Sequence, residues 1–384
     1  MKPLYFCAVF SCVALFHLNA AVRTWSGAGA DGNWSTAANW GGTAPVNGDL
    51  LVFSGTTRPN NTNDIANLSV NGLTFANHGF TLNGNLMALN GALTNSAGTN
   101  LMAQGVNVTV QNPTWNLAPG SEVRFNGQFT NSTTANPLAT LGFGGTVRIS
   151  STNCVLNRFY TLTSGAVIAD GCVLTTFDGF RVQPPAGGNA VFQITNNASF
   201  TIVSGGNLRL CQTATGGSSR VDLSSGILNI ATTSGAGAGD IFVGEAASTT
   251  TIFNQNGGLV EFTGNGNNRI AFANASATAN GTYNLNGGVL WTKQIAQVTA
   301  GSPGGTFNFN GGTLKPTTSS TTFFQGVQTA NVQVGGAIID TTNLNITIGQ
   351  NLGGPGPLTK IGTGILTLTG VNSYAGTTTV SNGT

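Results

Sequence analysis

The chain has 384 residues, of which only 6% are charged and 40% are hydrophobic, and its formal net charge is +2. An average globular domain carries about 25% charged residues. The hydrophobic content is enough for a core, which argues against disorder. The near-neutral charge argues against binding to nucleic acid or to an anionic membrane. We therefore expect a folded protein with a polar, uncharged surface and no nucleic-acid partner.

The first 21 residues have the features of a secretory signal peptide. Lys2 supplies the basic start, residues 4–16 are almost entirely apolar, and Ala20 and Ala21 suit cleavage. The apolar run is shorter than the ~20 residues that a membrane span needs, so an anchor is the weaker interpretation. We predict a signal peptide over 1–21, secretion of the protein, and no membrane-spanning segment in the mature chain.

Residues 22–56 form a distinct unit that is rich in tryptophan, with Trp25, Trp34 and Trp40 close together. Two interpretations are open. Exposed indole rings would make a carbohydrate-stacking platform, since sugar faces pack on aromatic rings. Buried rings would instead plug the first coil of a repeat fold, whose core and edge are otherwise open. We favour the second interpretation and expect an N-terminal cap over 22–56.

Residues 57–357 read as short runs of alternating apolar and polar residues, separated by Asn, Gly and Ser. This alternation has the period of β-strands. Between 221 and 317 related segments recur, and a repeat of this length means a solenoid, propeller or array. The last glycine of each copy falls at Gly226, Gly258, Gly288 and Gly312.

One period, residues 268–293, contains three strand-like runs and three corners. This arrangement fits one coil of an all-β, right-handed parallel β-helix with three sides. Stacked coils place like residues over like at about 4.8 Å. Turn preference alone is the alternative explanation for the corner Asn residues. Stacking predicts an internal column of Phe253, Tyr283 and Phe307 and a hydrogen-bonded corner ladder of Asn256, Asn286 and Asn310.

The last segment, 358–384, carries the pattern Lys-x-Gly-x-Gly-x-Leu-x-Leu-x-Gly, followed by Asn-x-Tyr-x-Gly-x-Thr. Leu366 and Leu368 alternate with Thr residues, which agrees with a β-strand. The residues expected to shape the corners and the final loop of this motif are Gly362, Gly364, Gly370, Asn372, Tyr374 and Gly376.

This motif resembles the autotransporter-associated β-strand repeat of long secreted bacterial surface proteins. The tryptophan pattern from Trp25 to Phe53 is similar to the mature N-terminus of the same proteins. The resemblance implies a β-helical passenger at the outer surface of a bacterium, and it implies no activity because the repeat is a structural unit. The chain ends at Thr384 in the middle of a repeat, so we expect a fragment of a longer protein.

An enzymatic alternative is open because many β-helices are polysaccharide lyases or hydrolases, whose sites need clustered carboxylates. Here the 11 acidic residues are scattered, and His78 is the one histidine after the leader. A histidine triad or a zinc site has little to build on. Coils of about 30 residues would align Arg209, Asp240 and Arg269 on one wall, as a candidate sugar-binding or catalytic patch. Ordinary turn Asp residues beside Gly are the alternative.

Two functions of different classes remain. We favour a non-enzymatic secreted or cell-surface β-solenoid, a stalk, adhesin or matrix component, with glycans or host or matrix surfaces as partners. A β-helical polysaccharide lyase or hydrolase is the alternative. We expect no cofactor and no metal. The odd number of cysteines after the leader is no disulfide framework, although Cys154 and Cys172 could pair across adjacent coils or lie buried as small apolar residues.

Overall fold

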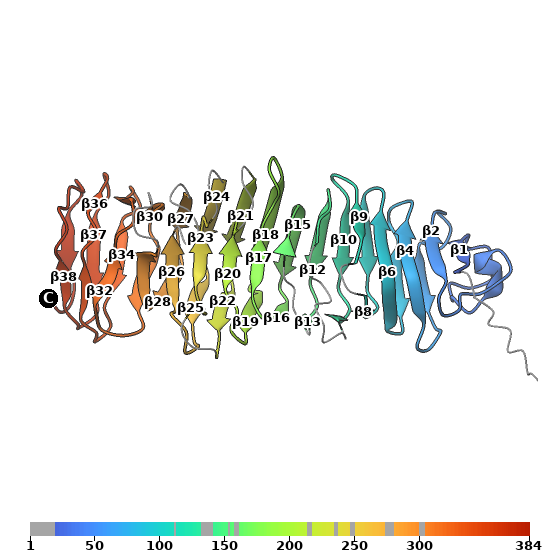
Figure 1. Ribbon diagram of the computed structural model, residues 1–384. Helices are drawn as coiled ribbons and strands as arrows, with labels where there is room; N and C mark the ends of the chain where they lie inside the picture. The colour runs from blue at the N-terminus through green and yellow to red at the C-terminus, as the bar shows by residue number, and fades with distance from the viewer. Residues whose placement is uncertain are drawn as a thin grey trace, which may run out of the picture.

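The protein is described by a computed structural model. Figure 1 shows an elongated stack of parallel strands that runs from the N-terminal end, in blue, to the C-terminal end, in red. Most of the predicted signal peptide, residues 1–19, lies outside the described residues, and that assignment stays a prediction. The described residues are 20–110, 113–131, 141–152, 154–156, 161–212, 217–233, 237–245, 250–272, 280–298 and 304–384.

Within these residues the strands form three sheets, and every strand pairs in parallel with the equivalent strand of the next coil. The second sheet has 13 strands, one per coil, which gives a parallel β-solenoid of about 13 turns. The all-β parallel β-helix predicted from the repeats is therefore confirmed. The right-handed winding stays a prediction.

The first sheet has 17 strands among the described residues. They are β1 (Val22–Trp25), β2 (Leu50–Phe53), β4 (Ser69–Phe75), β6 (Met87–Asn95), β8 (Val106–Val108), β9 (Trp115–Leu117), β11 (Phe129–Asn131), β13 (Cys154–Leu156), β16 (Val173–Phe177), β19 (Ser199–Val203), β22 (Ile227–Ala231), β25 (Leu259–Phe262), β28 (Val289–Thr292), β31 (Thr313–Pro316), β34 (Ala337–Asp340), β37 (Leu358–Ile361) and β39 (Thr378–Val380).

The 13 strands of the second sheet are β3 (Asn60–Asn63), β5 (Thr81–Gly84), β7 (Thr99–Met102), β10 (Glu122–Phe125), β12 (Thr146–Ile149), β15 (Gly165–Asp170), β18 (Asn189–Thr195), β21 (Ser218–Leu223), β24 (Thr250–Gln255), β27 (Gly281–Leu285), β30 (Thr306–Phe309), β33 (Thr329–Val332) and β36 (Leu352–Gly353). The third sheet has nine described strands, β14 (Thr161–Leu162), β17 (Phe180–Val182), β20 (Leu208–Leu210), β23 (Ile241–Val243), β26 (Arg269–Phe272), β29 (Gln294–Gln297), β32 (Ser320–Gln325), β35 (Ile346–Ile348) and β38 (Leu366–Leu368).

The first coils differ from the later ones because two of their sides belong to one continuous sheet. Strand β6 pairs with β8 through its first residues and with β9 through its last residues. Its pairing with β4 shifts register between Val70 and Gly72. Such a bulge bends a strand locally. A single long strand therefore turns a corner that later coils build from two separate strands.

Coil length varies along the solenoid while the inside–outside alternation is kept. Val147 pairs with Val167 across a short coil, whereas Ser219 pairs with Thr251 across a much longer one. The strands of the longer coil, β21, β22 and β23, have more residues than β12, β13 and β14 of the shorter one. Because a shift by one residue would turn every side chain to the opposite face, the inward rows stay in register although the coils differ in length.

The core is a continuous column of stacked apolar side chains. In β28, for example, Leu290 and Thr292 are buried, while Val289 and Trp291 are more exposed. One inward row runs through successive strands of the first sheet as Leu228, Val260, Leu290, Leu314 and Ile339.

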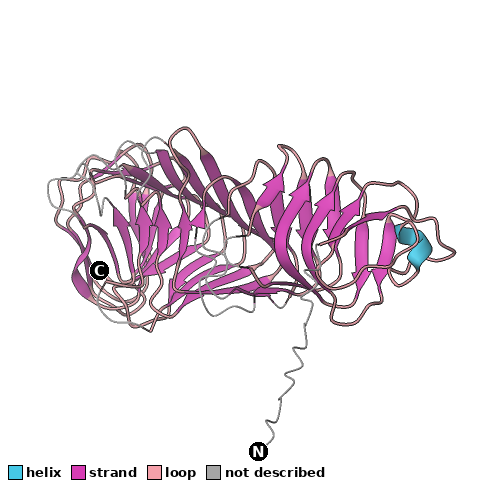
Figure 2. Ribbon diagram, turned by 45° about the vertical axis from the view of Figure 1, so that its right-hand side comes forward, coloured by secondary structure: helices cyan, strands magenta, loops and turns pink. Residues whose placement is uncertain are grey.

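The one helical element of the described part is the short 3-10 turn η1 (Ala37–Trp40), which Figure 2 shows in cyan near one end of the stack. In this part of the chain no helix is long and apolar enough to cross a membrane. Cys154, Cys172 and Cys211 are buried free thiols, so Cys154 and Cys172 do not form a disulfide here.

Candidate functional site

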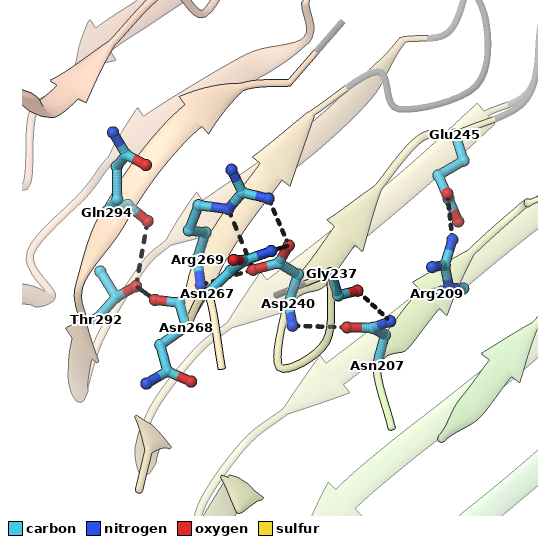
Figure 3. A network of polar contacts seen from close by, with 10 residues as sticks. All are labelled: Asn207, Arg209, Gly237, Asp240, Glu245, Asn267, Asn268, Arg269, Thr292 and Gln294. Carbon is cyan, nitrogen blue, oxygen red and sulfur yellow. Dashed lines mark hydrogen bonds and ion pairs between the residues drawn. The ribbon is translucent and has the colours of Figure 1, made fainter. Parts of the chain in front are cut away.

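The wall patch predicted at Arg209, Asp240 and Arg269 lies on the third sheet, and Figure 3 shows its polar contacts. Asp240 directly precedes β23 and Arg269 begins β26, and their side chains form an ion pair at 2.8 Å. Arg209 is in register with Phe242 and not with Asp240. The structure brings Asp240 and Arg269 into contact and places Arg209 on the same sheet, in line with the position two residues after Asp240.

Unequal coil lengths explain this offset of Arg209. Leu208 pairs with Ile241 and Ile241 pairs with Ile270, and the first of these two coils is the longer one. A uniform coil length therefore misplaces Arg209 by two positions along the strand. An even shift keeps a side chain on the same face, so Arg209 still points outward.

The carboxylate of Asp240 is fully buried and fully engaged. Its Oδ1 accepts hydrogen bonds from the backbone N–H (3.0 Å) and Nε (3.2 Å) of Arg269. Its Oδ2 accepts from Arg269 Nη2 (2.8 Å) and Asn267 Nδ2 (3.2 Å), while its own backbone N–H donates to Asn207 Oδ1. An ionised carboxylate has about four acceptor sites. All four are used, so the carboxylate joins its own coil to the next one, while the backbone N–H of Asp240 joins it to the coil before.

Arg209 has a separate acidic partner. Its Nη1 lies 2.5 Å from Oε1 of Glu245, whose side chain is 1% exposed. The guanidinium also lies 4.3 Å from the centre of the Phe242 ring. Stacking on an aromatic face and pairing with a carboxylate are both favourable for arginine. The cation is therefore held in one position on the wall.

The chemistry open to this patch is limited by these contacts. General acid–base catalysis needs a titratable group within reach of a substrate proton. Here the carboxylates of Asp240 and Glu245 are both buried, and each faces an arginine. No group of three or more His, Cys, Asp or Glu side chains that could hold a metal ion occurs among the described residues. The patch is thus a pair of structural ion pairs.

Two shallow hollows of the wall lie away from this patch. One, of about 440 Å³, is bounded by β6 and β9 and includes Asn95 and Trp115. The other, of about 570 Å³, crosses β32, β35 and β38 and includes Ser320, Asn345 and Thr367. The described residues that line these two hollows include no acidic or basic side chain.

The three tryptophans of the N-terminal unit do not form a sugar platform. Trp25 and Trp34 have no exposed surface, and Trp40 is 4% exposed. The rings of Trp25 and Trp34 each contact Trp40 edge-on, at 5.0 and 5.7 Å between centroids, and all three pack on Phe53 of β2. A stacked sugar needs an open ring face, and none is available here.

The predicted column and corner ladder are both present. The rings of Phe253, Tyr283 and Phe307 are stacked within 6° of parallel, at 4.7 and 5.2 Å. Asn286 Nδ2 donates to Asn256 Oδ1 at 2.8 Å, and Asn310 Nδ2 donates to Asn286 Oδ1 at 3.2 Å.

A glycine with positive φ lies at the corner of each of the three Asn-Gly-Gly copies, and also at Gly226, where φ is 88°. Gly258 and Gly288 have φ of 68°, a conformation that glycine adopts without strain. In the third copy the positive φ of 102° falls on Gly311 instead of Gly312. There the chain reaches the corner one residue earlier.

A second ladder was missed in the sequence. On the outer face of the second sheet, the amide Nδ2 of each Asn donates to the preceding coil at 2.7 to 2.9 Å. The first acceptor is the carboxylate of Asp222, which also accepts from Gln193 Nε2 and Arg220 Nε. The recurring first Asn of the Asn-x-Asn-Gly-Gly copies was the available signal. The ladder runs through Asp222, Asn254, Asn284, Asn308 and Asn331.

A charged network joins earlier coils of the same sheet. Arg148 lies 2.6 Å from Glu122 and 2.9 Å from Asp170. Desolvation raises the pKa of Asp170, but hydrogen bonds from Asn196 and Arg148 outweigh it, so that pKa lies below its ordinary value. The pKa of Glu122 is likewise lowered, because its contacts with Arg148 and Arg124 outweigh desolvation.

In the last coils, Lys360 occupies an inward position of the first sheet, in register with Ile339. Its side chain is 1% exposed. A buried ammonium is costly unless it is hydrogen-bonded. Nζ donates to Thr341 Oγ1 (2.9 Å) and to the carbonyl oxygens of Ile361 (3.2 Å), Gly362 (2.7 Å) and Asn382 (2.9 Å).

Asn372 also connects neighbouring coils, because its Oδ1 accepts the backbone N–H of Leu352 at 3.0 Å. The Tyr374 hydroxyl makes a local contact, at 2.7 Å from Thr378 Oγ1. A Cβ on Gly364 would lie 1.9 Å from the carbonyl oxygen of Leu344. The glycines at 370 and 376 are packed against the preceding coil in the same way.

Comparison with known proteins identifies this last segment. Residues 358–384 match the family model described as the passenger-associated-transport-repeat. A search of the curated proteins and a search of the solved structures found no match. The matched repeat and the parallel β-solenoid together fit an autotransporter passenger-like repeat protein.

Proposed function

We propose that this chain, which carries a passenger-associated-transport-repeat on a parallel β-solenoid, is a non-enzymatic surface protein of the autotransporter passenger type. Its role would be that of a stalk, adhesin or matrix component. Its partners would be glycans or host or matrix surfaces, which it contacts through its long wall.

The observation that carries this proposal is the continuity between the matched repeat and the rest of the solenoid. Strand β37 of the repeat pairs with β34 in unbroken register over Ala337 to Asp340, and β39 pairs with β37. The repeat is thus one more coil of the same stack. The matched family is named for its association with passenger transport. A repeat of this family at the end of the stack therefore supports secretion and surface exposure of the whole solenoid.

The chemistry of the wall supports a structural or binding role. The ion pairs at Arg209 and Arg269 each engage a buried carboxylate, and the later coils of the second sheet carry a ladder of neutral amides, from Asn254 to Asn331, on their outer face. Such a surface can present hydrogen-bonding groups in regular rows. It supports contact with an extended partner more than it supports bond cleavage.

Surface exposure can be tested by limited protease treatment of intact cells that express the full-length protein. The proposal predicts that peptides from 22–384 are released from intact cells while a cytoplasmic marker stays whole. Release only after lysis would contradict it. Treatment of lysed cells under the same conditions provides the control for susceptibility to the protease.

A further inference from the structure

One tryptophan differs from the rest in its exposure. The chain has five tryptophans. Trp25, Trp34, Trp40 and Trp115 are at most 4% exposed, whereas Trp291 is 37% exposed on the outer face of β28. Core packing therefore explains four of the tryptophans but does not explain why Trp291 stands on the outer face.

The Trp291 ring is held in place although it is exposed. Its Nε1 donates to the carbonyl oxygen of Pro316 at 3.0 Å, and Lys315 Nζ lies 5.1 Å from the ring centre. Lys315 is the partner of Trp291 in register on the next strand, β31. An aromatic ring that is already oriented loses little conformational entropy when it meets a ligand.

The coil before Trp291 supplies a carboxylate in the same row. Glu261 on β25 is in register with Trp291, and Asn229 on β22 is in register with Glu261. Partial burial raises the pKa of Glu261. No salt bridge to Glu261 is formed by the described residues, although seven such contacts occur elsewhere among them. Its oxygens are thus acceptors beside the ring.

An aliphatic row flanks this polar one, two residues earlier on the same strands. Ile227, Leu259 and Val289 are in register and half-buried, with side chains on the outer face. Outward aliphatic side chains next to an exposed indole favour a ligand that has apolar as well as polar faces. Because these rows run from one coil to the next, a ligand that follows them would lie along the long axis of the solenoid.

We propose that the outer face of β22, β25, β28 and β31 binds a neutral polysaccharide chain, with one sugar ring stacked on Trp291. The apolar face of a pyranose packs on the indole, as carbohydrate rings do on aromatic side chains. Glu261 accepts hydrogen bonds from sugar hydroxyls on one side of the ring and Lys315 donates to them on the other. We refer to these residues, Asn229, Glu261, Trp291 and Lys315, as the Trp291 row.

The Trp291 row carries one carboxylate, Glu261, and one ammonium group, Lys315, so its net charge is zero and favours a ligand without net charge. A uronic acid directly beside Glu261 would place two carboxylates close together, and like charges at short range are unfavourable. Adjacent strands are about 4.8 Å apart, close to the advance of one ring along an extended pyranose chain. Neighbouring sugars would therefore meet Glu261, Trp291 and Lys315 in turn. This inference rests on the proposed surface role and names its ligand class.

The test is a titration of the purified chain with soluble oligosaccharides of β-linked glucose, mannose and xylose. Trp291 is the exposed tryptophan, so binding should reduce acrylamide quenching of tryptophan fluorescence. Variants at 291 lack this reporter, so their binding is measured by isothermal titration calorimetry beside the native chain. Trp291→Ala should weaken binding about tenfold or more, which corresponds to ~1.4 kcal/mol or more. Trp291→Phe, which keeps a ring, should retain most of the affinity, and Glu261→Gln should weaken it several-fold.

Val334→Ala is the matched control, because Val334 is 81% exposed and lies outside the row. Circular dichroism and thermal melting should show that all variants are folded. Absence of binding to every neutral oligosaccharide, or equal binding by Trp291→Ala and the native chain, would overturn the proposal. Binding of polygalacturonate alone or of a protein alone would also overturn it. Any of these results leaves the protease test of surface exposure unaffected, so the two proposals fail separately.

Discussion

The side-chain nitrogen of Lys360 lies 2.9 Å from the backbone carbonyl oxygen of Asn382, one coil further along the chain. Lys360 follows Ile339 in an inward row that is otherwise apolar. Three further oxygen atoms complete its surroundings. The lysine of the matched repeat therefore serves as an internal clamp between its own coil and the next one.

Replacement of Lys360 by Met tests this clamp. Methionine keeps the apolar stem but removes the three N–H donors that the ammonium group shares among four oxygen atoms, and bonds to charged groups contribute about 1.5–3 kcal/mol each. Because removal of the buried charge offsets part of this loss, we expect a net destabilisation of about 2 kcal/mol. Hydrogen exchange should rise most at 378–384. Unchanged exchange in this segment would contradict the clamp.

The buried hydroxyl of Tyr283 gives a second prediction. It donates to Gln255 Oε1 at 2.7 Å inside the aromatic column, and burial raises its pKa well above the ordinary value. Tyr283→Phe keeps the stack but leaves a buried acceptor without its donor, which costs about 1–3 kcal/mol. Denaturant unfolding should show this loss. Tyr283→Leu, which also removes the stacked ring, should be less stable still, and a Leu variant equal to the Phe variant would argue against the stack.

The outer Asn ladder has a direction that a single substitution can test. Asn284 donates to Asn254 and accepts from Asn308. Asn284→Asp keeps the acceptor but replaces the donor by an oxygen that faces another oxygen. We expect a loss of about 1 kcal/mol at neutral pH that shrinks in acid, when the carboxyl group regains a proton to donate. Asp222→Asn, at the accepting end, is the matched variant. Its one oxygen can replace Oδ1 and still accept from Asn254, but its NH2 then faces Gln193 and Arg220, which both donate to Oδ2, so this variant should also lose stability.

These ladders also show what the sequence could predict and why. Stacked coils bring equivalent residues together, so the copies at 253, 283 and 307 were enough to predict an aromatic column before the fold was known. The wall patch required absolute register, which depends on loop lengths. The unequal coils on either side of Ile241 moved Arg209 away from Asp240. Alternation from Leu358 would have placed Lys360 inside. The three N-terminal tryptophans were expected to be buried, but their packing on Phe53 depends on tertiary structure that no local pattern specifies.

The Arg148 network predicts a specific response to acid. The pKa values of Glu122 and Asp170 are lowered in the folded state. Their contribution to stability is therefore fully present above the unfolded pKa near 4 and is lost as the pH falls through the lowered folded values. Arg148→Met should remove this contribution at neutral pH and flatten the acid dependence of the melting temperature. If the melting temperature of Arg148→Met fell between neutral pH and pH 3 as steeply as that of the native chain, the stabilising role of this network would be contradicted.

The N-terminal unit gives a further prediction about stability. Trp34 is fully buried, packs on Phe53 and donates from Nε1 to Asn61 Oδ1 at 2.7 Å. We predict that this unit caps the first coil. Trp34→Ala should then cost roughly 3–5 kcal/mol, as is typical of large-to-small core changes. In this variant, amide hydrogen exchange should increase in β2 and β4. An increase in exchange that is confined to residues 22–49 would contradict a capping role.

The most direct test of the central claim, that this solenoid binds polysaccharide through its wall without cleaving it, is one assay with two readouts. The purified chain is incubated with insoluble neutral glycans and with pectin and alginate, and both protein retention and new chain ends are measured. We predict retention on a neutral glycan with no new reducing ends. A rise in absorbance from unsaturated sugar products, or a steady release of reducing ends, would contradict the account and favour a lyase or hydrolase.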